Sequence, residues 1–205
     1  MHHLFLIRHG TTEAIEKHLM QGSTDSLLSA NGREEARRAA EALKAMRFDA
    51  VFSSPMGRSV ETARIITHSH HGLEIIQLDD LHEMNFGFYE YKPYFGSPDE
   101  VPQGFRRLNL LVKILIAQAT GESLSCVRRR AFKSWEQITT TTPGGVVLIV
   151  SHGVLLNYLL QYLLPEDSFE AIKPISLRPC SITELEVYSP GKAKILRING
   201  TAHLK

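Results

Sequence analysis

The chain has 205 residues, of which 43% are hydrophobic and 22% are charged, a composition typical of a globular protein with one core. Its formal net charge of +1 excludes recognition of nucleic acid or acidic membranes through bulk charge, so anions must be bound by a local basic cluster. The two cysteines, Cys126 and Cys180, exclude a disulfide framework and a four-cysteine metal site, and we expect two reduced thiols.

The sequence also argues against a secreted or membrane-spanning protein. The amino-terminal residues lack the basic and long apolar regions of a signal peptide. The longest apolar run, residues 110–117, is interrupted by Lys113 and is too short to span a bilayer. We therefore expect a cytoplasmic protein.

Short apolar runs alternate with amphipathic segments in the first half of the chain. The runs predict buried strands at residues 4–7, 50–52 and 73–78. Between the first two, Ser29 or Asn31 can cap a helix over residues 32–46 that places alanines on one face. After the second, Ser53-Ser54-Pro55 opens another helix, with the proline near its first position.

The second half begins with a loop, predicted by the abundance of Pro, Gly and Tyr at residues 89–104. Two helical segments follow, over residues 105–119 and 123–138. They are too long for a simple crossover between strands. We therefore expect both segments to form a cap over the crevice at the carboxyl ends of the strands.

The remaining elements complete a sheet. An apolar run at residues 146–150 predicts a strand, and Pro165 ends the helix that follows over residues 154–164. Residues 181–188 and 193–198 predict a hairpin.

Strand–helix alternation with buried strands predicts an α/β fold, a three-layer α/β/α sandwich with a mainly parallel sheet. The hairpin adds antiparallel character at one edge. We expect a single domain over residues 1–205, with the cap inserted at about residues 88–122.

Two of the predicted strands end in the same way. Arg8-His9-Gly10 follows the first strand, and Ser151-His152-Gly153 follows the strand at residues 146–150. Glycine lets the backbone turn directly after each histidine. Ligands of open α/β sheets bind beyond the carboxyl ends of the strands, so two histidines and an arginine there indicate a site for an anionic group. A phosphoryl group is the first candidate.

Four short motifs occur in a fixed order along the chain. They are Arg8-His9-Gly10, Ser54-Pro55 with Arg58, Leu81-His82-Glu83 leading to Gly87, and Ser151-His152-Gly153. Their order and spacing resemble the histidine phosphatase superfamily, which includes the cofactor-dependent phosphoglycerate mutases. Supporting matches are Gln21-Gly22, Asp25, Leu28, Gly32, Ala36, Gly121-Glu122-Ser123 and Arg130. The resemblance covers nearly the whole chain apart from residues 91–120.

The resemblance implies that His9 is the nucleophile and that Arg8 and Arg58 bind the phosphate. A neutral imidazole is not repelled by a phosphate dianion, and it forms a phosphoramidate that water can hydrolyse. Neighbouring cations favour that neutral form, and each planar guanidinium can hold two oxygens at once. Without the family pattern, Arg58 would be interpreted as an exposed helix residue paired with Glu61 or Glu35.

Further roles follow from the same resemblance. His152 corresponds to the second histidine, which donates a hydrogen bond to the transferring group, and the helix near Gly153 points its amino end at the same anion. Glu83 corresponds to the general acid and base, which protonates the departing alcohol and then deprotonates water. Glu90 is the local alternative for that role.

Two positions depart from the family pattern. Many members carry an asparagine that helps to bind phosphate six residues after the nucleophile, where this chain has Ile15. Gln21 and Gly22 still match and can supply part of that contact. Tyr91 replaces a glycine, which implies a different path for its loop. Either change can lower activity or narrow the substrate range.

Other sites fit the sequence less well. His68, His70 and His71 cluster without a carboxylate or cysteine at ligand spacing, so we expect a polar helix end and no metal site. The glycine-rich phosphate loops of nucleotide enzymes are absent from the sequence. The basic run at residues 127–130 is interpreted as a solvated helix face, with Arg130 turned differently from its neighbours.

The sequence thus predicts a metal-independent phosphatase that hydrolyses a small phosphate ester through a phosphohistidine on His9, with no cofactor, nucleic-acid or membrane partner. A mutase of the phosphoglycerate type is the main alternative, and a phosphate-binding module without turnover is the third. The apolar residues 110–117 are interpreted as a buried cap face, with a substrate pocket or a homodimer interface as alternatives.

Overall fold

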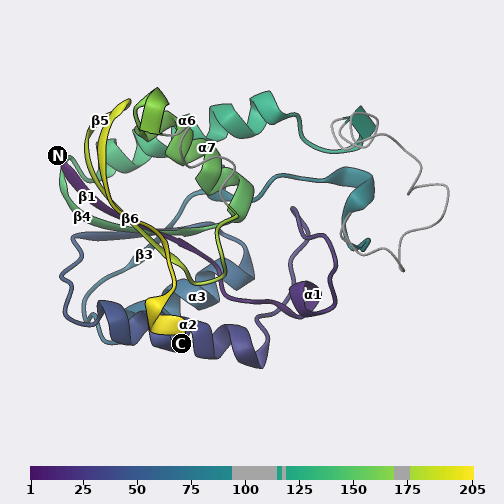
Figure 1. The fold of residues 1–205 in the computed structure, drawn as a ribbon, viewed down its shortest axis with the longest axis horizontal. Helices are drawn as coiled ribbons and strands as arrows, with labels where there is room; N and C mark the ends of the chain where they lie inside the picture. Colours follow the sequence, from purple (N-terminus) through teal and green to yellow (C-terminus); the bar gives the residue numbers. More distant parts are fainter. Residues whose placement is uncertain (94–114, 117–118, 169–175) are drawn as a thin grey trace.

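The computed structural model describes residues 1–93, 115–116, 119–168 and 176–205. These residues contain a six-stranded sheet in the order β3-β2-β4-β1-β5-β6 (Figure 1). The strands are β1 (His2–Arg8), β2 (Ala50–Ser53), β3 (Ile75–Gln77), β4 (Gly145–Ser151), β5 (Ile182–Ser189) and β6 (Lys192–Gly200). Strands β1 to β4 are parallel, whereas β5 and β6 pair antiparallel. The predicted mainly parallel sheet with an antiparallel edge is confirmed.

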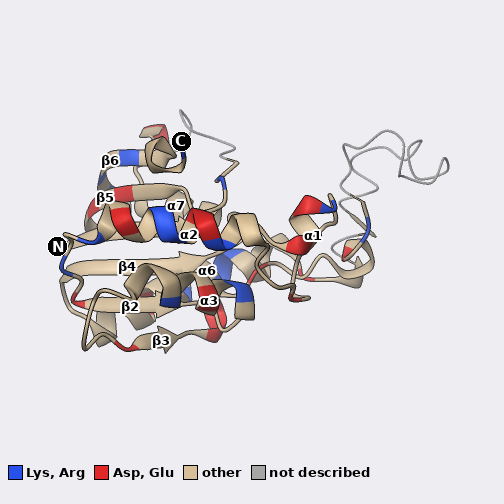
Figure 2. Ribbon diagram, turned by 90° about the horizontal axis from the view of Figure 1, so that it is seen from below, with Lys and Arg blue, Asp and Glu red and all other residues tan. Residues whose placement is uncertain are grey.

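Helices cover both faces of the sheet and give the predicted three layers. The helices are α1 (Glu13–Glu16), α2 (Ala30–Leu43), α3 (Gly57–Thr67), α6 (Leu124–Thr141) and α7 (Gly153–Leu163), with short 3-10 turns η1 (Asp79–Leu81), η2 (Gly87–Tyr89) and η3 (Ala202–Leu204). Helices α2 and α3 pack on one face, and α6 and α7 on the other (Figure 1). Figure 2 shows basic and acidic residues interleaved along α2, whereas β4 carries neither.

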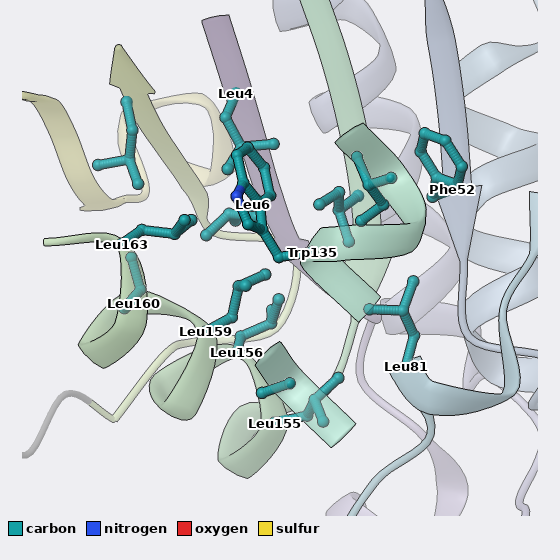
Figure 3. Close-up of a cluster of buried hydrophobic side chains, with 14 of the residues drawn as sticks. Leu4, Leu6, Phe52, Leu81, Trp135, Leu155, Leu156, Leu159, Leu160 and Leu163 are labelled. Carbon is teal, nitrogen blue, oxygen red and sulfur yellow. The ribbon is translucent and has the colours of Figure 1, made fainter. Parts of the chain in front are cut away.

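The larger hydrophobic core lies between the sheet and the layer formed by α6 and α7 (Figure 3). Its labelled members include Leu4 and Leu6 of β1, Trp135 of α6, and Leu155, Leu156, Leu159, Leu160 and Leu163 of α7. Burying one leucine fully contributes about 1.5–3 kcal/mol, so this leucine-rich face holds α7 firmly against the sheet. The first residue of α7, Gly153, is thereby placed at the carboxyl end of β4.

The prediction that residues 123–138 form part of a cap is wrong. They lie in α6, and the side chains that α6 buries in this core are Val127, Ala131, Trp135 and Ile138. Because these positions recur every three or four residues, they form one apolar stripe that faces the sheet. The other predicted cap helix, residues 105–119, and much of the predicted insertion at residues 88–122 lie outside the described residues.

Two helix starts refine the prediction. The Ser29 side chain accepts a hydrogen bond from the Gly32 N–H (3.1 Å), so α2 is capped by Ser29 and begins before Asn31. Helix α3 begins at Gly57 with Met56 as its N-cap, so Pro55 directly precedes the cap and lies two residues before the first helical position. The Ser54 N–H donates to the Val150 carbonyl (3.0 Å), which prolongs the contact with β4 beyond the end of β2. Among the described residues, no helix combines the length and hydropathy that crossing a bilayer requires.

Candidate active site

The two strand–His–Gly segments meet at one edge of the sheet. Strands β1 and β4 are parallel neighbours with Arg8 opposite Ser151, so His9 and His152 leave the sheet side by side. Their ring centroids are 5.1 Å apart, and both residues are buried. The structure therefore brings together the two histidines that the sequence singled out.

The His9 ring has two different hydrogen-bond partners. Nδ1 lies 2.8 Å from the Gly10 carbonyl, which can only accept, so Nδ1 carries the proton. Nε2 accepts a hydrogen bond from Nε of Arg58 at 3.3 Å. Burial first, and then the positive charges of Arg58 and Arg8, hold the pKa of His9 well below its usual value. His9 is therefore neutral near pH 7, with a lone pair on Nε2.

A close backbone contact fixes the turn after His9. A Cβ atom at Gly10 would lie 2.5 Å from the Gly32 carbonyl oxygen, and one at Gly32 would lie 1.9 Å from the carbonyl oxygen of Thr11. Glycine is therefore required at both positions, because no other residue allows the two backbones to approach so closely. The first turn of α2 thus abuts the segment that carries His9.

Arg58 is buried beneath the site, with 1% of its surface exposed. It donates to the carbonyls of Gly22 (2.8 Å) and Thr24 (3.0 Å) and pairs with the Asp25 carboxylate (3.0 Å). Burial lowers the pKa of Arg58, and Asp25 opposes that change. These partners aim the guanidinium at His9.

The interpretation of Arg58 as an exposed helix residue is wrong. Its two expected surface partners bind elsewhere: Glu61 pairs with Arg33 (2.6 Å), and Glu35 accepts from Thr11.

A cavity of about 380 Å³ opens onto these groups. The predicted site residues that line it are Arg8, His9, Gln21, Arg58, Glu83 and Gly153. The remaining lining residues are Met20, Phe86, Val154, Asn157, Ser176 and Leu177. Nη1 of Arg8 donates to the Leu177 carbonyl (2.8 Å), and its buried Nε has no partner within the part of the chain that the structure describes. Two guanidinium groups therefore line the cavity together with His9, and that of Arg58 contacts the His9 ring directly.

The carboxylate of Glu83 lies at the amino end of α7. Its oxygens accept from the backbone N–H groups of Val154 (3.1 Å), Leu155 (3.2 Å) and Met84 (2.9 Å). The positive end of the helix dipole also favours a carboxylate at this place. Glu83 also lines the cavity and can exchange a proton with a group bound there.

His152 is oriented by two serine hydroxyls that sequence reasoning did not assign. Its Nε2 lies 2.8 Å from Oγ of Ser54 and 3.3 Å from Oγ of Ser59, whereas Nδ1 is buried with no partner among the described residues. When the hydroxyls donate to Nε2, Nδ1 carries the proton and can donate it to a bound anion. Burial, followed by the charge of Arg58, keeps the pKa of His152 well below its usual value. The position of Ser54 in the Ser-Pro motif was the available signal.

Of the two predicted phosphate-binding residues in the loop after α1, Gln21 lines the cavity and Gly22 does not. The Oε1 atom of Gln21 accepts from the Thr12 hydroxyl. The Gly22 carbonyl orients Arg58 instead. A Cβ at Gly22 would collide with the Met84 carbonyl, so this glycine permits close packing.

Neither the residues that depart from the family pattern, Ile15 and Tyr91, nor the alternative acid Glu90 lines this cavity. Glu90 accepts from the N–H groups of Ser23 (2.7 Å), Thr24 (2.8 Å) and Phe86 (3.0 Å), so it holds a loop together, and it is not among the residues that line the cavity. Ile15 lines a separate cavity.

Tyr91 has a φ of +58°, which is the left-handed conformation that glycine prefers. The local backbone therefore keeps a glycine-like conformation despite the substitution. The Tyr91 hydroxyl donates to the Asp25 carbonyl (2.7 Å), and the Asp25 carboxylate in turn holds Arg58.

The other clusters do not form a second site. Among the described residues, no group of three or more His, Cys, Asp or Glu side chains could hold a metal ion. The ring of His70 instead lies 5.2 Å from that of Phe48. In the basic run, Arg128 and Arg129 are exposed, whereas Arg130 is turned inward, as predicted.

Comparison with known proteins agrees with this geometry. Residues 4–201 match the family model of the histidine phosphatase superfamily (branch 1). The chain therefore belongs to the histidine phosphatase superfamily.

Individual relatives of this chain include proteins named as a phosphoglycerate mutase and as a phosphatase. The probable phosphoglycerate mutase GpmB of Escherichia coli strain K12 is 32% identical over 185 residues, which cover 89% of this chain and 84% of the relative. The structure of YhfR from Bacillus stearothermophilus aligns with a TM-score of 0.82 at 28% identity, and both chains are covered completely. Phosphoserine phosphatase from Entamoeba histolytica aligns with a TM-score of 0.78 at 25% identity, again over 100% of both chains. The family and these relatives support an enzyme that acts on phosphate esters.

Proposed function

We propose that this protein hydrolyses a small phosphate monoester, without a metal ion, through a phosphohistidine formed on His9. The observation that carries the proposal is the state of His9 at the cavity. Its Nδ1 proton is held by the Gly10 carbonyl, and its Nε2 carries a lone pair that accepts from Nε of Arg58 beside the cavity that His9, Arg8 and Arg58 line. These groups supply the positive charge that a phosphoryl transition state needs.

In the first step, Nε2 of His9 attacks phosphorus and the bond to the ester oxygen breaks. Glu83 gives its proton to that oxygen, so the alcohol leaves neutral. His152 donates from Nδ1 to a phosphoryl oxygen.

In the second step, Glu83 takes a proton from water as the water oxygen attacks phosphorus. The bond from phosphorus to Nε2 then breaks, which returns neutral His9 and releases inorganic phosphate. The enzyme ends the cycle in its starting protonation state, so no other reactant is needed.

Phosphoryl transfer to a second hydroxyl of the substrate is the alternative, and the naming of the Escherichia coli relative favours it. Hydrolysis is favoured by the similarity to phosphoserine phosphatase over the whole chain. It is also favoured by the predicted cap, which is apolar rather than rich in charged residues at 110–117.

Turnover of a panel of phosphate esters tests this function. The panel contains 3-phosphoglycerate, phosphoserine, sugar phosphates and p-nitrophenyl phosphate, each with and without a chelator. We expect release of inorganic phosphate from at least one ester, unaffected by the chelator. Formation of 2-phosphoglycerate without phosphate release would establish the mutase instead. Binding of phosphate with no turnover of any ester would establish the binding module.

The covalent intermediate is tested separately. Rapid quenching into alkali, which preserves phosphohistidine, followed by peptide mass spectrometry should find phosphate on His9. Phosphate on another residue would overturn the mechanism even if hydrolysis is observed.

A further inference from the structure

We propose that Arg130 and Glu122 are a positioning pair that holds the segment carrying Glu83 at the cavity. This proposal rests on the function of Glu83 proposed above and assigns a role to two residues outside the cavity. Arg130 lies on α6, in the second turn, and neither residue lines the cavity.

The segment around Glu83 has little regular structure of its own. It lies between the 3-10 turns η1 and η2, and it belongs to none of the six strands of the sheet that the described residues form. Its carboxylate is fixed by the amide groups of α7, but its backbone needs separate partners.

Arg130 supplies those backbone partners. Its Nη1 donates to the carbonyls of Asp80 (3.0 Å) and His82 (2.9 Å), and its Nη2 lies 3.5 Å from the carbonyl of Glu83. Three carbonyls of one short segment thus converge on a single guanidinium. A guanidinium spreads five donors over three nitrogens and can serve these carbonyls and a carboxylate together, whereas the three donors of an ammonium all lie on one nitrogen.

Glu122 fixes the guanidinium from the other side. Its two carboxylate oxygens accept from Nε (2.8 Å) and Nη2 (2.6 Å) of Arg130, and both side chains are about 15% exposed. Burial alone would raise the pKa of Glu122, but the hydrogen bonds and charge of Arg130 outweigh it and lower that pKa. A bidentate, largely buried pair of this kind restricts both side chains to one geometry.

The backbone of Glu122 also contacts the far side of the Glu83 segment. Its N–H donates to the Asn85 carbonyl at 2.8 Å. Nearby, the Thr120 hydroxyl accepts from the Phe88 N–H (3.0 Å), and a Cβ at Gly87 would lie 2.4 Å from Thr120. Residues on both sides of Glu83 are therefore held by one unit, composed of Arg130 and the chain at residues 120–122.

Positioning matters here because proton transfer requires the acid within hydrogen-bond reach of the leaving oxygen. A displacement of about 1 Å can cost about 10²-fold in rate. Loss of the pair should therefore reduce the acid-dependent part of catalysis and leave phosphate binding intact.

The test compares Arg130→Ala, Arg130→Lys and Glu122→Gln with Arg129→Ala, the adjacent exposed arginine on the same helix. For an alkyl phosphate, we expect kcat to fall about 10–100-fold in Arg130→Ala, with KM changed less than about twofold. For p-nitrophenyl phosphate, whose leaving group needs no proton, the loss should be much smaller. Arg130→Lys and Glu122→Gln should show weaker forms of the same pattern, and Arg129→Ala should retain full activity.

A double variant separates positioning from folding. Because Arg130 acts through Glu83, adding Arg130→Ala to Glu83→Gln should cost little more than Glu83→Gln alone. Equal losses on both substrates in all Arg130 and Glu122 variants, or fully additive losses, would overturn the proposal. If Glu83→Gln itself shows no dependence on the leaving group, the proposed function of Glu83 fails. If only the Arg130 and Glu122 variants lack that dependence, the positioning role alone fails.

Discussion

The two halves of the candidate site are held in place in different ways. His9 directly follows β1, a strand that is paired along its length with β4 on one side and β5 on the other. Glu83 lies in an irregular segment that depends on single side chains, such as Arg130, and on the amide groups of α7. The half with the proposed nucleophile is therefore positioned by the backbone ladder, and the half with the proposed acid by individual contacts that a distant substitution can remove.

The largest effect is expected at the centre of the sheet-held half. His9→Ala removes the proposed nucleophile and should lower turnover by at least about 10³-fold, because the covalent route is lost. Steady-state rates measure the loss, and thermal unfolding checks that the fold is kept. Activity within tenfold of the unmodified protein would show that His9 is not the nucleophile.

The acid half should respond selectively. Glu83→Gln keeps the shape of the side chain but cannot transfer a proton, so we expect a loss of about 10²–10⁴-fold for alkyl phosphates. The loss should be much smaller for p-nitrophenyl phosphate. Glu90→Gln serves as the control, because its carboxylate holds a loop rather than facing the cavity. If Glu90→Gln showed the selective loss instead, the two carboxylates would exchange roles.

Side-chain contacts within the sheet-held half should matter less. Ser54→Ala removes the 2.8 Å contact to His152, and Ser59→Ala removes the longer contact of 3.3 Å. One hydrogen bond contributes about 0.5–1.5 kcal/mol, so each variant should lose about 2–12-fold in kcat, with Ser54→Ala losing more. Losses above 100-fold would mean that His152 depends on single contacts as Glu83 does, and the comparison would no longer hold.

Acid should lower the free energy of unfolding of the protein, because the two buried histidines of the sheet-held half are neutral in the folded state. The pKa values of His9 and His152 are both lowered, first by burial and second by the positive charge of Arg58. In the unfolded chain a histidine titrates near 6.5, so below that pH the unfolded state binds more protons and the free energy of unfolding falls. Each histidine can contribute at most about 1.4 kcal/mol per pH unit.

Urea unfolding at about pH 7.5 and about pH 5.5 measures this change. His9→Asn should lose less stability on acidification than the unmodified protein, because it lacks one of the titrating groups. An equal loss in both proteins would show that His9 makes no contribution to the pH dependence.

The sheet and its two histidines could be predicted because continuous apolar runs followed by glycine have few structural interpretations. The position of α6 against the sheet could not be predicted. An amphipathic stripe shows that one face of a helix is buried but does not identify the element that covers that face. The contacts of Ser59 and Arg130 depend on where distant parts of the chain come to lie, and no local pattern encodes that. For Ser54, the Ser-Pro motif marked the position but did not identify His152 as its partner. For Arg58, the motif indicated phosphate binding, but only the structure shows its burial under the loop at residues 22–25.

The contact between Gly10 and Gly32 has a consequence for altering the range of esters accepted. A side chain at Gly10 would collide with the Gly32 carbonyl, and one at Gly32 would collide with the Thr11 carbonyl. A substitution at either position would therefore separate α2 from the loop that carries His9. A randomised gene library should therefore leave both codons unchanged. It should vary Met20, Phe86 and Val154 instead, which border the same cavity without touching that junction.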